Sequence, residues 1–315
     1  MCWPTRRTIY DNRFAEAKRA HATVARTISG FEPVTMIANA TDVAEATDMC
    51  GASVDVVALP IDDSWFRDTG PIYVLEGDRR VGTQWQFNGW GGKFVPHDND
   101  AQLARRWLAS RNEPMHRIDM VLEGGSINVD GRGSLITTEQ CLLHPNRNPG
   151  MSKTEIADRL RGEFGCTAVV WLPFGLALDD DTDGHVDNVA AFVAPSTVVM
   201  QGCDDPREDD HARCAANVIA AREAGLTVHE IPVLPFVEVD GGRVCVPYLN
   251  FYFVNGAVIV PTSGHPADAD MLALIGEFVG GRDVVGLDVG TILAVGGGGI
   301  HCITQQVPAV PHSIG

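Results

Sequence analysis

The chain has no hydrophobic run long enough to cross a membrane. Hydrophobic residues make up 45% of its 315 positions, but none of their runs approaches the ~20 apolar residues that a spanning helix needs. The start also lacks a basic stretch followed by an apolar segment and a cleavage site, which is the pattern of a secretory signal. The sequence therefore predicts no membrane association, a cytoplasmic location and a large buried core.

Basic residues are scarce. Lys and Arg number 24 against 41 Asp and Glu, which gives a formal net charge of −17. Binding to nucleic acid needs a basic surface, so we expect no nucleic-acid partner. An acidic surface attracts cations, although solubility alone explains the charge equally well.

Paired cysteine motifs are missing as well. The chain has eight cysteines but no C-x-x-C, and their spacing suggests neither a zinc cage nor a disulfide framework. The acidic run 179–184 has the form Asp-x-Asp-x-Asp-Gly, yet a calcium loop needs a carboxylate at its twelfth position, which here is Ala190. We therefore expect no metal.

What the sequence does contain is an alternation of strands, hairpins and helices in units of roughly sixty residues. Asp130-Gly131 and Asn255-Gly256 each lie between two short apolar runs, which is a hairpin signal. Helices are expected at residues 100–110, 152–164, 205–224 and 266–279. This alternation predicts the α/β fold class. No linker separates two halves, so residues 1–315 are expected to form a single domain.

One cysteine stands in an unusual setting near the end of the chain. Four glycines, residues 296–299, precede Ile300-His301-Cys302, and glycines let a backbone come close to a ligand. The apolar run 284–295 before them predicts a strand with a turn. Cys302 is therefore placed like a nucleophile, although an isolated cysteine is more often a small buried hydrophobe.

Three polar clusters follow other apolar stretches. They span residues 62–71, 122–126 and 179–188, and the predicted strands before them are 54–59, 118–121 and 168–172, the last extended through Leu178. Carboxylates at strand ends, a histidine and a distant cysteine predict a site assembled from several segments.

These residue types suit chemistry on a guanidinium group. Two carboxylates can hold that planar cation through paired hydrogen bonds, and Asp68 and Asp187 fit this role. A thiolate is the best side-chain nucleophile at neutral pH, which suits Cys302. One histidine can protonate the departing ammonia and then activate water, which suits His185.

Further residues can assist. Glu123 could set the tautomer of His185, and Trp65 could stack on the guanidinium, with a place in the core as an equal alternative. On a strand, His185 and Asp187 would point to the same face. His301 would point away from Cys302 on an extended strand, so core packing or a loop hydrogen bond is expected for it.

Structural roles for the same residues remain open as alternatives to these functional ones. Asp68 could form a structural ion pair with its neighbour Arg67. His185, Asp187, Glu123 and His301 are metal-ligand types, but their spacing matches no metal motif, which disfavours a metal-dependent hydrolase.

The motifs resemble those of agmatine deiminases. The resemblance rests on Trp-Phe-Arg-Asp-Thr-Gly-Pro at 65–71, Leu-Glu-Gly-Gly-Ser at 122–126, Gly-His-Val-Asp-Asn at 184–188 and Gly-Gly-Ile-His-Cys-Ile-Thr-Gln-Gln at 298–306. Segments 137–143, 146–149 and 248–252 agree too, in the same order along essentially the whole chain. The bacterial peptidylarginine deiminase branch shares these motifs.

The resemblance implies a pentein fold, which is a five-bladed α/β propeller of strand–hairpin–helix repeats with a central site. It implies cofactor-free hydrolysis of a guanidine to a ureido group and ammonia through a covalent thiouronium on Cys302. His185 would be the acid/base, Glu123 its partner, and Asp68 and Asp187 the guanidinium carboxylates.

We therefore expect an agmatine deiminase that forms N-carbamoylputrescine. The alternatives are a deiminase of free or peptidyl arginine, an amidinotransferase with the same site, or a non-catalytic binding protein. Asp181 or Asp183 could bind the far amine of the substrate, with a solvated acidic loop as an equal alternative. The oligomeric state, homo-oligomer included, stays open.

Two departures from the family pattern stand out. Gly299 takes the place of the usual Asn, which could loosen the cysteine loop. The start at Met1-Cys2-Trp3-Pro4 is close to the family's Trp-Pro pair, so a short N-terminal segment is expected to be missing.

Overall fold

Four three-stranded sheets in this chain are built on one plan. In the computed structural model, which describes residues 1–310, each begins with an antiparallel hairpin, and its third strand pairs parallel with the second strand of that hairpin. The strands are β3 (Ile72–Glu76), β4 (Arg79–Gln86) and β5 (Met115–Val121); β6 (Ile127–Val129), β7 (Ser134–Thr138) and β8 (Ala168–Leu172); β9 (Ala190–Ala194), β10 (Thr197–Gln201) and β11 (Thr227–Ile231); β14 (Tyr252–Val254), β15 (Ala257–Thr262) and β16 (Asp283–Asp288).

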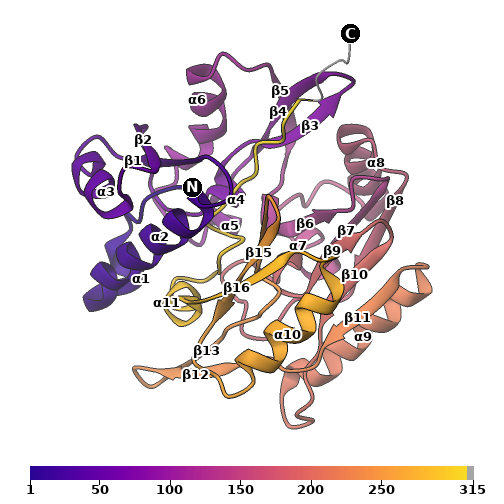
Figure 1. Cartoon of the computed structure of the whole chain (residues 1–315). Helices are drawn as coiled ribbons and strands as arrows, with labels where there is room; N and C mark the ends of the chain where they lie inside the picture. The colour runs from indigo at the N-terminus through magenta and orange to yellow at the C-terminus, as the bar shows by residue number, and fades with distance from the viewer. Residues whose placement is uncertain (311–315) are drawn as a thin grey trace. The chain divides into compact units, whose positions relative to one another are not determined.

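A helix joins the second and third strands of each sheet, because a parallel pair needs a crossover connection. The four helices are α6 (Leu103–Ser110), α8 (Lys153–Phe164), α9 (Asp209–Glu223) and α10 (Asp268–Phe278). Figure 1 shows α9 alongside β11 and α10 alongside β16. The predicted helices and the recurring strand–hairpin–helix unit are confirmed.

Two smaller sheets complete the β-structure of the described residues. Strands β1 (Val34–Ala38) and β2 (Val54–Ala58) pair in parallel across α3 (Val43–Cys50), and β12 (Phe236–Val239) forms a hairpin with β13 (Gly242–Cys245). The remaining helices are α1 (Arg7–Tyr10), α2 (Phe14–Ser29), α4 (Phe66–Thr69), α5 (Gly89–Gly92), α7 (Glu139–Leu142) and α11 (Gly290–Val295), with short 3-10 turns at η1 (Asp11–Arg13), η2 (Asp100–Gln102), η3 (Gly124–Ser126) and η4 (Val186–Asn188). No helix in residues 1–310 is both long and apolar enough to cross a bilayer.

Both predicted hairpin turns form where the sequence places them. Asp130 accepts hydrogen bonds from the backbone of Arg132 (2.7 Å) and Ser134 (2.9 Å), and Gly131 takes a φ of 67°. Gly256 takes a φ of 84° in the turn between β14 and β15. Glycine is favoured at both positions because a side chain disfavours this backbone region.

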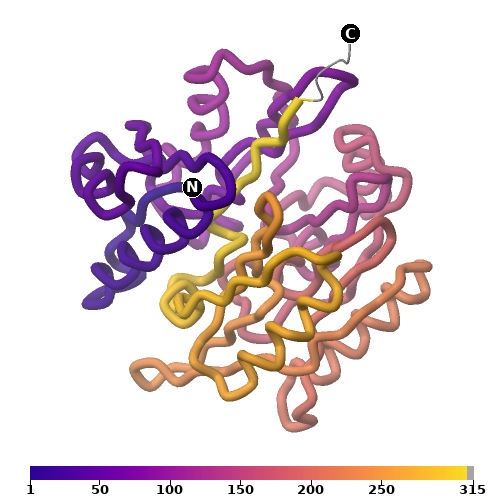
Figure 2. The backbone as a smooth tube through the Cα atoms, in the orientation of Figure 1, coloured from indigo at the N-terminus to yellow at the C-terminus, as the bar shows by residue number. Residues whose placement is uncertain are grey.

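The elements form two compact units. Unit 1 consists of Met1–Ser29, Pro33–Gly124 and the segment from Cys302 onward, and unit 2 consists of Gly30–Glu32 and Gly125–His301. The last described segment lies in unit 1, where Pro71 accepts a hydrogen bond from Gln305 (2.8 Å) and Pro308 accepts one from Arg80 (2.8 Å). Figure 2 shows this segment in yellow beside the purple trace of the β3–β4 hairpin.

Each unit has its own apolar core. In unit 1, Phe66 of α4 and Trp107 of α6 pack edge to face at 5.9 Å, within a cluster that includes Leu103 and Leu108. In unit 2, one cluster lies around Leu172, Val198 and Met200, and a second lies around Tyr248, Val258 and Ile275. Such burial is the main favourable contribution to folding.

Three predicted strands are wrong in part or in whole. The run 284–295 is strand only to Asp288, and its second half is the helix α11. Strand β8 ends at Leu172, and residues up to Leu178 form turns in which Phe174 and Leu178 are exposed. The segment His185–Asp187 is not a strand at all, because Val186–Asn188 forms the 3-10 turn η4.

Candidate active site

The site residues predicted from the sequence are divided between the two units. Asp68, Trp65, Glu123 and Cys302 belong to unit 1, whereas His185, Asp187, Asp181 and Asp183 belong to unit 2. The geometry is therefore described within each unit.

Helix α4 presents Asp68 in unit 1. The carbonyl of Trp65 accepts hydrogen bonds from the backbone of Asp68 (3.1 Å) and Thr69 (3.2 Å), which closes this short turn. Asp68 is buried, and its Oδ2 accepts a hydrogen bond from the indole nitrogen of Trp90 (3.0 Å). A buried carboxylate needs such donors because it has left the water that solvated it.

Trp90 was not expected from the sequence. Its backbone has a φ of 53°, which is rare for a bulky residue. Asn88 supports this conformation by accepting a hydrogen bond from the backbone of Gly91 (2.8 Å). The ring packs edge to face against Phe87 at 4.8 Å and Phe94 at 5.4 Å. Strain held in place by packing in this way is typical of functional sites.

Cys302 lies in a turn rather than on a strand, and it is 5% exposed. Its carbonyl accepts a hydrogen bond from the backbone of Arg67 (3.1 Å), and the Arg67 guanidinium donates to Gln306 (2.7 Å). Arg67 thus connects α4, which carries Asp68, to the segment that carries Cys302. These bonds account for the Arg in the 65–71 motif and for Gln306.

Glu123 and Trp65 are both buried in unit 1. The glycine after Glu123 is required by space, since a Cβ at Gly124 would lie 2.2 Å from the carbonyl oxygen of Arg67. Gly124 thereby lets the Glu123 segment approach α4 closely.

In unit 2, Asp179 organises the loop that leads to His185. Its carboxylate accepts hydrogen bonds from the Thr182 hydroxyl (2.6 Å), the His185 backbone (3.1 Å) and the Asn188 amide (3.2 Å). The carboxylate of Asp179, the first aspartate of the run 179–184, therefore stabilises the conformation of its own loop.

Asp181 and Asp183 of the same loop have different surroundings. Asp183 accepts hydrogen bonds from Arg147 (2.7 Å) and Asn146 (2.9 Å). Asp181 is exposed, and its carboxylate lies against the backbone of Gly297, where a Cβ would come within 2.6 Å of Oδ2. Asp181 thus borders the glycine run that precedes the cysteine.

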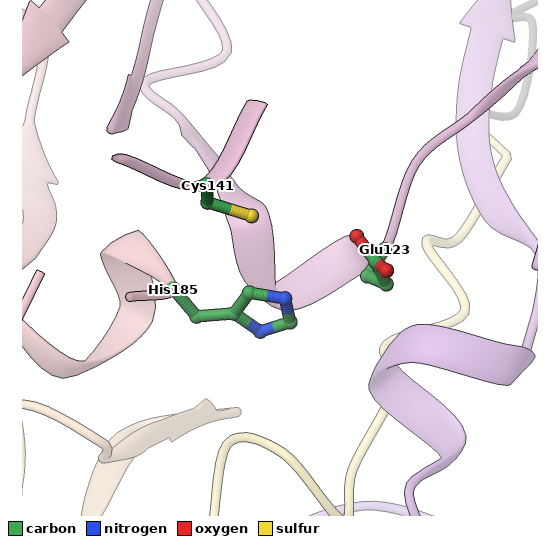
Figure 3. A group of neighbouring side chains, drawn as sticks. All are labelled: Glu123, Cys141 and His185. Atoms are coloured by element: carbon green, nitrogen blue, oxygen red, sulfur yellow. The ribbon is translucent and has the colours of Figure 1, made fainter. Parts of the chain in front are cut away.

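His185 is 1% exposed and begins the η4 turn. The Thr138 hydroxyl donates to the carbonyl of Gly184 (2.6 Å) and accepts from the backbone of Cys141 (3.2 Å), so helix α7 is tied to the residue before His185. Figure 3 shows the Cys141 thiol and the His185 ring, whose ligand-type atoms lie within 4.8 Å of one another. Cys141 was not predicted from the sequence.

Asp187 and His301 form a direct pair in unit 2. Oδ2 of Asp187 accepts a hydrogen bond from Nδ1 of His301 (2.8 Å), and Asp187 is 2% exposed. The extended strand predicted for His301 is wrong, because residues 300–303 form a turn. A hydrogen bond from a loop was one of the two roles expected for His301, and the bond to Asp187 confirms it.

Asn250 fills the space beside Gly299. A Cβ at position 299 would lie 2.5 Å from its Oδ1. Asn250 is fully buried and belongs to the Tyr-Leu-Asn-Phe-Tyr segment 248–252. A side chain at position 299 would therefore clash with Asn250, whereas glycine leaves room for it.

Comparison with known proteins gives consistent matches. The family model described as Porphyromonas-type peptidyl-arginine deiminase matches residues 1–308. The chain is similar to the agmatine deiminase of Stutzerimonas stutzeri, with 39% identity over 98% of this chain and 92% of the relative. Agmatine deiminase of Pseudomonas aeruginosa is also 39% identical, with the same coverage.

Solved structures agree with these relatives. Agmatine deiminase of Enterococcus faecalis superposes with a TM-score of 0.92 at 30% identity, covering 98% of this chain and 92% of that one. Substrate-bound agmatine deiminase of C. jejuni gives 0.90 at 27%, covering 96% and 91%. An arginine dihydrolase domain from cyanobacteria, at 14% identity and a TM-score of 0.55, shares the fold alone.

Proposed function

The chain belongs to the Porphyromonas-type peptidyl-arginine deiminase family, and we propose that it hydrolyses agmatine to N-carbamoylputrescine and ammonia. The observation that carries this function is the 39% identity to agmatine deiminases along 98% of the chain. The enzyme is a hydrolase of C–N bonds in a linear amidine, and its partner is a small guanidine substrate.

Cys302 and His185 carry out the bond-breaking and proton-transfer steps of the proposed reaction. The Cys302 thiolate attacks the guanidinium carbon, and the tetrahedral adduct collapses as one C–N bond breaks. His185 gives its proton to the departing ammonia, which leaves a thiouronium on Cys302. Neutral His185 then takes one proton from water as the water attacks. Breaking of the C–S bond restores the thiolate, and loss of the remaining hydroxyl proton to the released ammonia gives the neutral ureido product.

The carboxylates hold and orient the reacting groups. Asp68 and Asp187 bind the guanidinium nitrogens, and their burial strengthens charge-assisted hydrogen bonds. Glu123, which is also buried, holds the tautomer of His185. Trp65 lies three residues before Asp68 in the sequence and is buried. Its ring borders the guanidinium face of the substrate.

Asp181 is the stronger candidate for the far amine of agmatine, because it is exposed and borders the glycine run. Asp183 contributes to substrate binding by holding the loop in place, because its carboxylate already accepts hydrogen bonds from Arg147 and Asn146.

We extend the proposal to architecture and compartment. Four sheets of one plan and the β1–β2 pair are the parts of a single five-bladed propeller domain. All eight cysteines are free thiols, which suits a reducing compartment such as the cytoplasm.

The test measures ureido product and ammonia from purified protein with agmatine and, separately, arginine. Cys302→Ala should lose turnover by several orders of magnitude because no other group forms the covalent intermediate. Cys166→Ala, which removes another buried thiol, is the matched control and should keep activity. Agmatine should give the higher kcat/KM, since arginine brings an α-carboxylate that needs a cation. Wild-type-like turnover in Cys302→Ala would reject the mechanism.

A further inference from the structure

Within unit 2, His301 donates a hydrogen bond to Asp187, the proposed guanidinium-binding carboxylate. The bond from Nδ1 to Oδ2 is 2.8 Å long, and it joins residues 114 positions apart in the sequence. Because an ionised carboxylate only accepts hydrogen bonds, ionised Asp187 requires the proton of this bond on Nδ1. The side chain of His301 is 14% exposed and that of Asp187 is 2% exposed, so the bond lies at the edge of the interior.

Both ends of this pair are fixed by one buried amide, Asn250. The backbone N–H of His301 donates to the Asn250 carbonyl (3.0 Å) and to its Oδ1 (2.9 Å). The Asn250 amide donates to Oδ1 of Asn188 (2.8 Å), and Asn188 is the residue after Asp187. Asn250 therefore holds the turn that carries His301 and the turn that carries Asp187 at the same time.

A free carboxylate does not hold a fixed plane. The last torsion of an aspartate is broad and roughly two-fold, so rotation of the carboxylate costs little. A guanidinium binds best when its N–H groups lie in the carboxylate plane, so that the hydrogen bonds run parallel. A donor fixed on Oδ2 restricts this rotation before the substrate arrives, which lowers the ordering cost of binding.

We propose that His301 is a positioning residue that donates from Nδ1 to Asp187 and fixes the carboxylate plane for the guanidinium of the substrate; this assignment rests on the proposed function. It also gives a reason for histidine before Cys302, because Nδ1 of histidine supplies an N–H donor at this position. The role is distinct from that of His185, which moves protons.

Two variants separate hydrogen bonding from packing. His301→Asn keeps an N–H donor near the position of Nδ1, whereas His301→Phe keeps the ring and removes the donor. His301→Phe should raise the KM for agmatine about tenfold or more, as expected for loss of a hydrogen bond to a charged group, with a smaller change in kcat. His301→Asn should recover most of that loss. His116→Asn is the control, because His116 is 51% exposed on β5, and its kinetics should match the wild type.

The contrary outcomes are clear. A His301→Phe enzyme with the wild-type KM would overturn the proposal, and equal losses in both variants would assign His301 to packing. The ring ¹⁵N spectrum provides a readout that needs no substrate. The Nδ1 signal of His301 is the one that disappears in His301→Asn. Asp187→Asn should move this signal, because an amide accepts a hydrogen bond more weakly than a carboxylate does. An unmoved signal would refute the bond. A wild type that leaves agmatine intact would instead refute the proposed function, while the spectrum would still decide whether His301 donates to Asp187.

Discussion

At the scale of single residues, Asp100 shows how far burial can move a carboxyl group. It is 1% exposed, and its Oδ1 accepts hydrogen bonds from the backbone of Asp62 (2.9 Å) and Asp63 (3.4 Å). Its Oδ2 is buried and has no hydrogen-bond partner in residues 1–310. Burial raises the pKa of Asp100 to about 8 because the charged form loses its solvation. Asp100 therefore carries a proton near neutral pH.

This raised pKa predicts that the protein loses stability as the pH rises. The folded state keeps the Asp100 proton between pH 4 and 8, approximately, whereas the unfolded chain has lost it. Since the folded state binds more protons in this window, the free energy of unfolding falls by at most about 1.4 kcal/mol per pH unit for one group.

Asp100→Asn should flatten that dependence, because the amide mimics the protonated acid. The measurement is the urea midpoint at pH 5, 6, 7 and 8 in both proteins. The assignment is wrong if the two curves keep the same slope.

Residue types in motifs were enough to predict Cys302, His185, Asp187 and Asp68 as candidates. Their supporting residues were not predictable from one sequence. Trp90 bonds Asp68 from 22 positions away, and His301 bonds Asp187 from 114 positions away. Such pairs are created by the fold, and no local pattern encodes them.

At the scale of elements, α8 shows the most direct link from sequence to structure. The Ser152 hydroxyl accepts from the backbone of Glu155 (3.3 Å), and the Glu155 carboxylate accepts from the backbone of Ser152 (2.8 Å). This capping box satisfies two backbone donors that a helix start leaves unpaired.

Removing the cap should therefore weaken unit 2. Ser152→Ala is expected to cost about 1 kcal/mol, read as a lower midpoint of thermal unfolding. Thr154→Ala in the same exposed turn is the control and should change little, since alanine is the better helix former. An unchanged midpoint in Ser152→Ala would show that packing, not the cap, decides the start of α8.

Elements were predicted well where turn chemistry is explicit and poorly where only apolar content was available. Asp130-Gly131 and Asn255-Gly256 placed two hairpins correctly. The run 284–295 offered no such signal at its midpoint, and the change from β16 to α11 depends on Gly290. A Cβ at that residue would lie 2.4 Å from Val246 and 2.7 Å from the carbonyl of Thr262. Close approach of distant segments thus decides the boundary.

At the scale of the whole molecule, six of the eight cysteines have thiols of low reactivity. Burial raises the pKa of the Cys50 thiol to about 11 and those of Cys214 and Cys245 to about 12. It raises the pKa values of Cys2, Cys166 and Cys203 as well. Since the thiolate is the reactive form, these six groups react slowly at neutral pH.

We therefore expect stoichiometric iodoacetamide at pH 7 to label Cys302 first. Activity should fall in proportion to this label, and agmatine should slow both processes. Peptide mass spectrometry of the folded protein would measure the label, with the guanidinium-unfolded chain as the control in which all eight thiols react. Inactivation that follows a label on another cysteine would contradict the assignment of the nucleophile.

The discontinuity of unit 1 has a consequence for how the chain is made. Unit 1 needs residues from both sides of unit 2, including Gln305, Gln306 and Pro308, which bond Pro71, Arg67 and Arg80. At about 5–20 residues per second, a ribosome needs on the order of 10–35 s to add residues 125–301 between its parts. During that interval α4 has been synthesised but lacks its partner segment, whereas unit 2 emerges as a continuous stretch apart from Gly30–Glu32. The nascent enzyme therefore exposes its N-terminal core longest, and that is where a chaperone would find it.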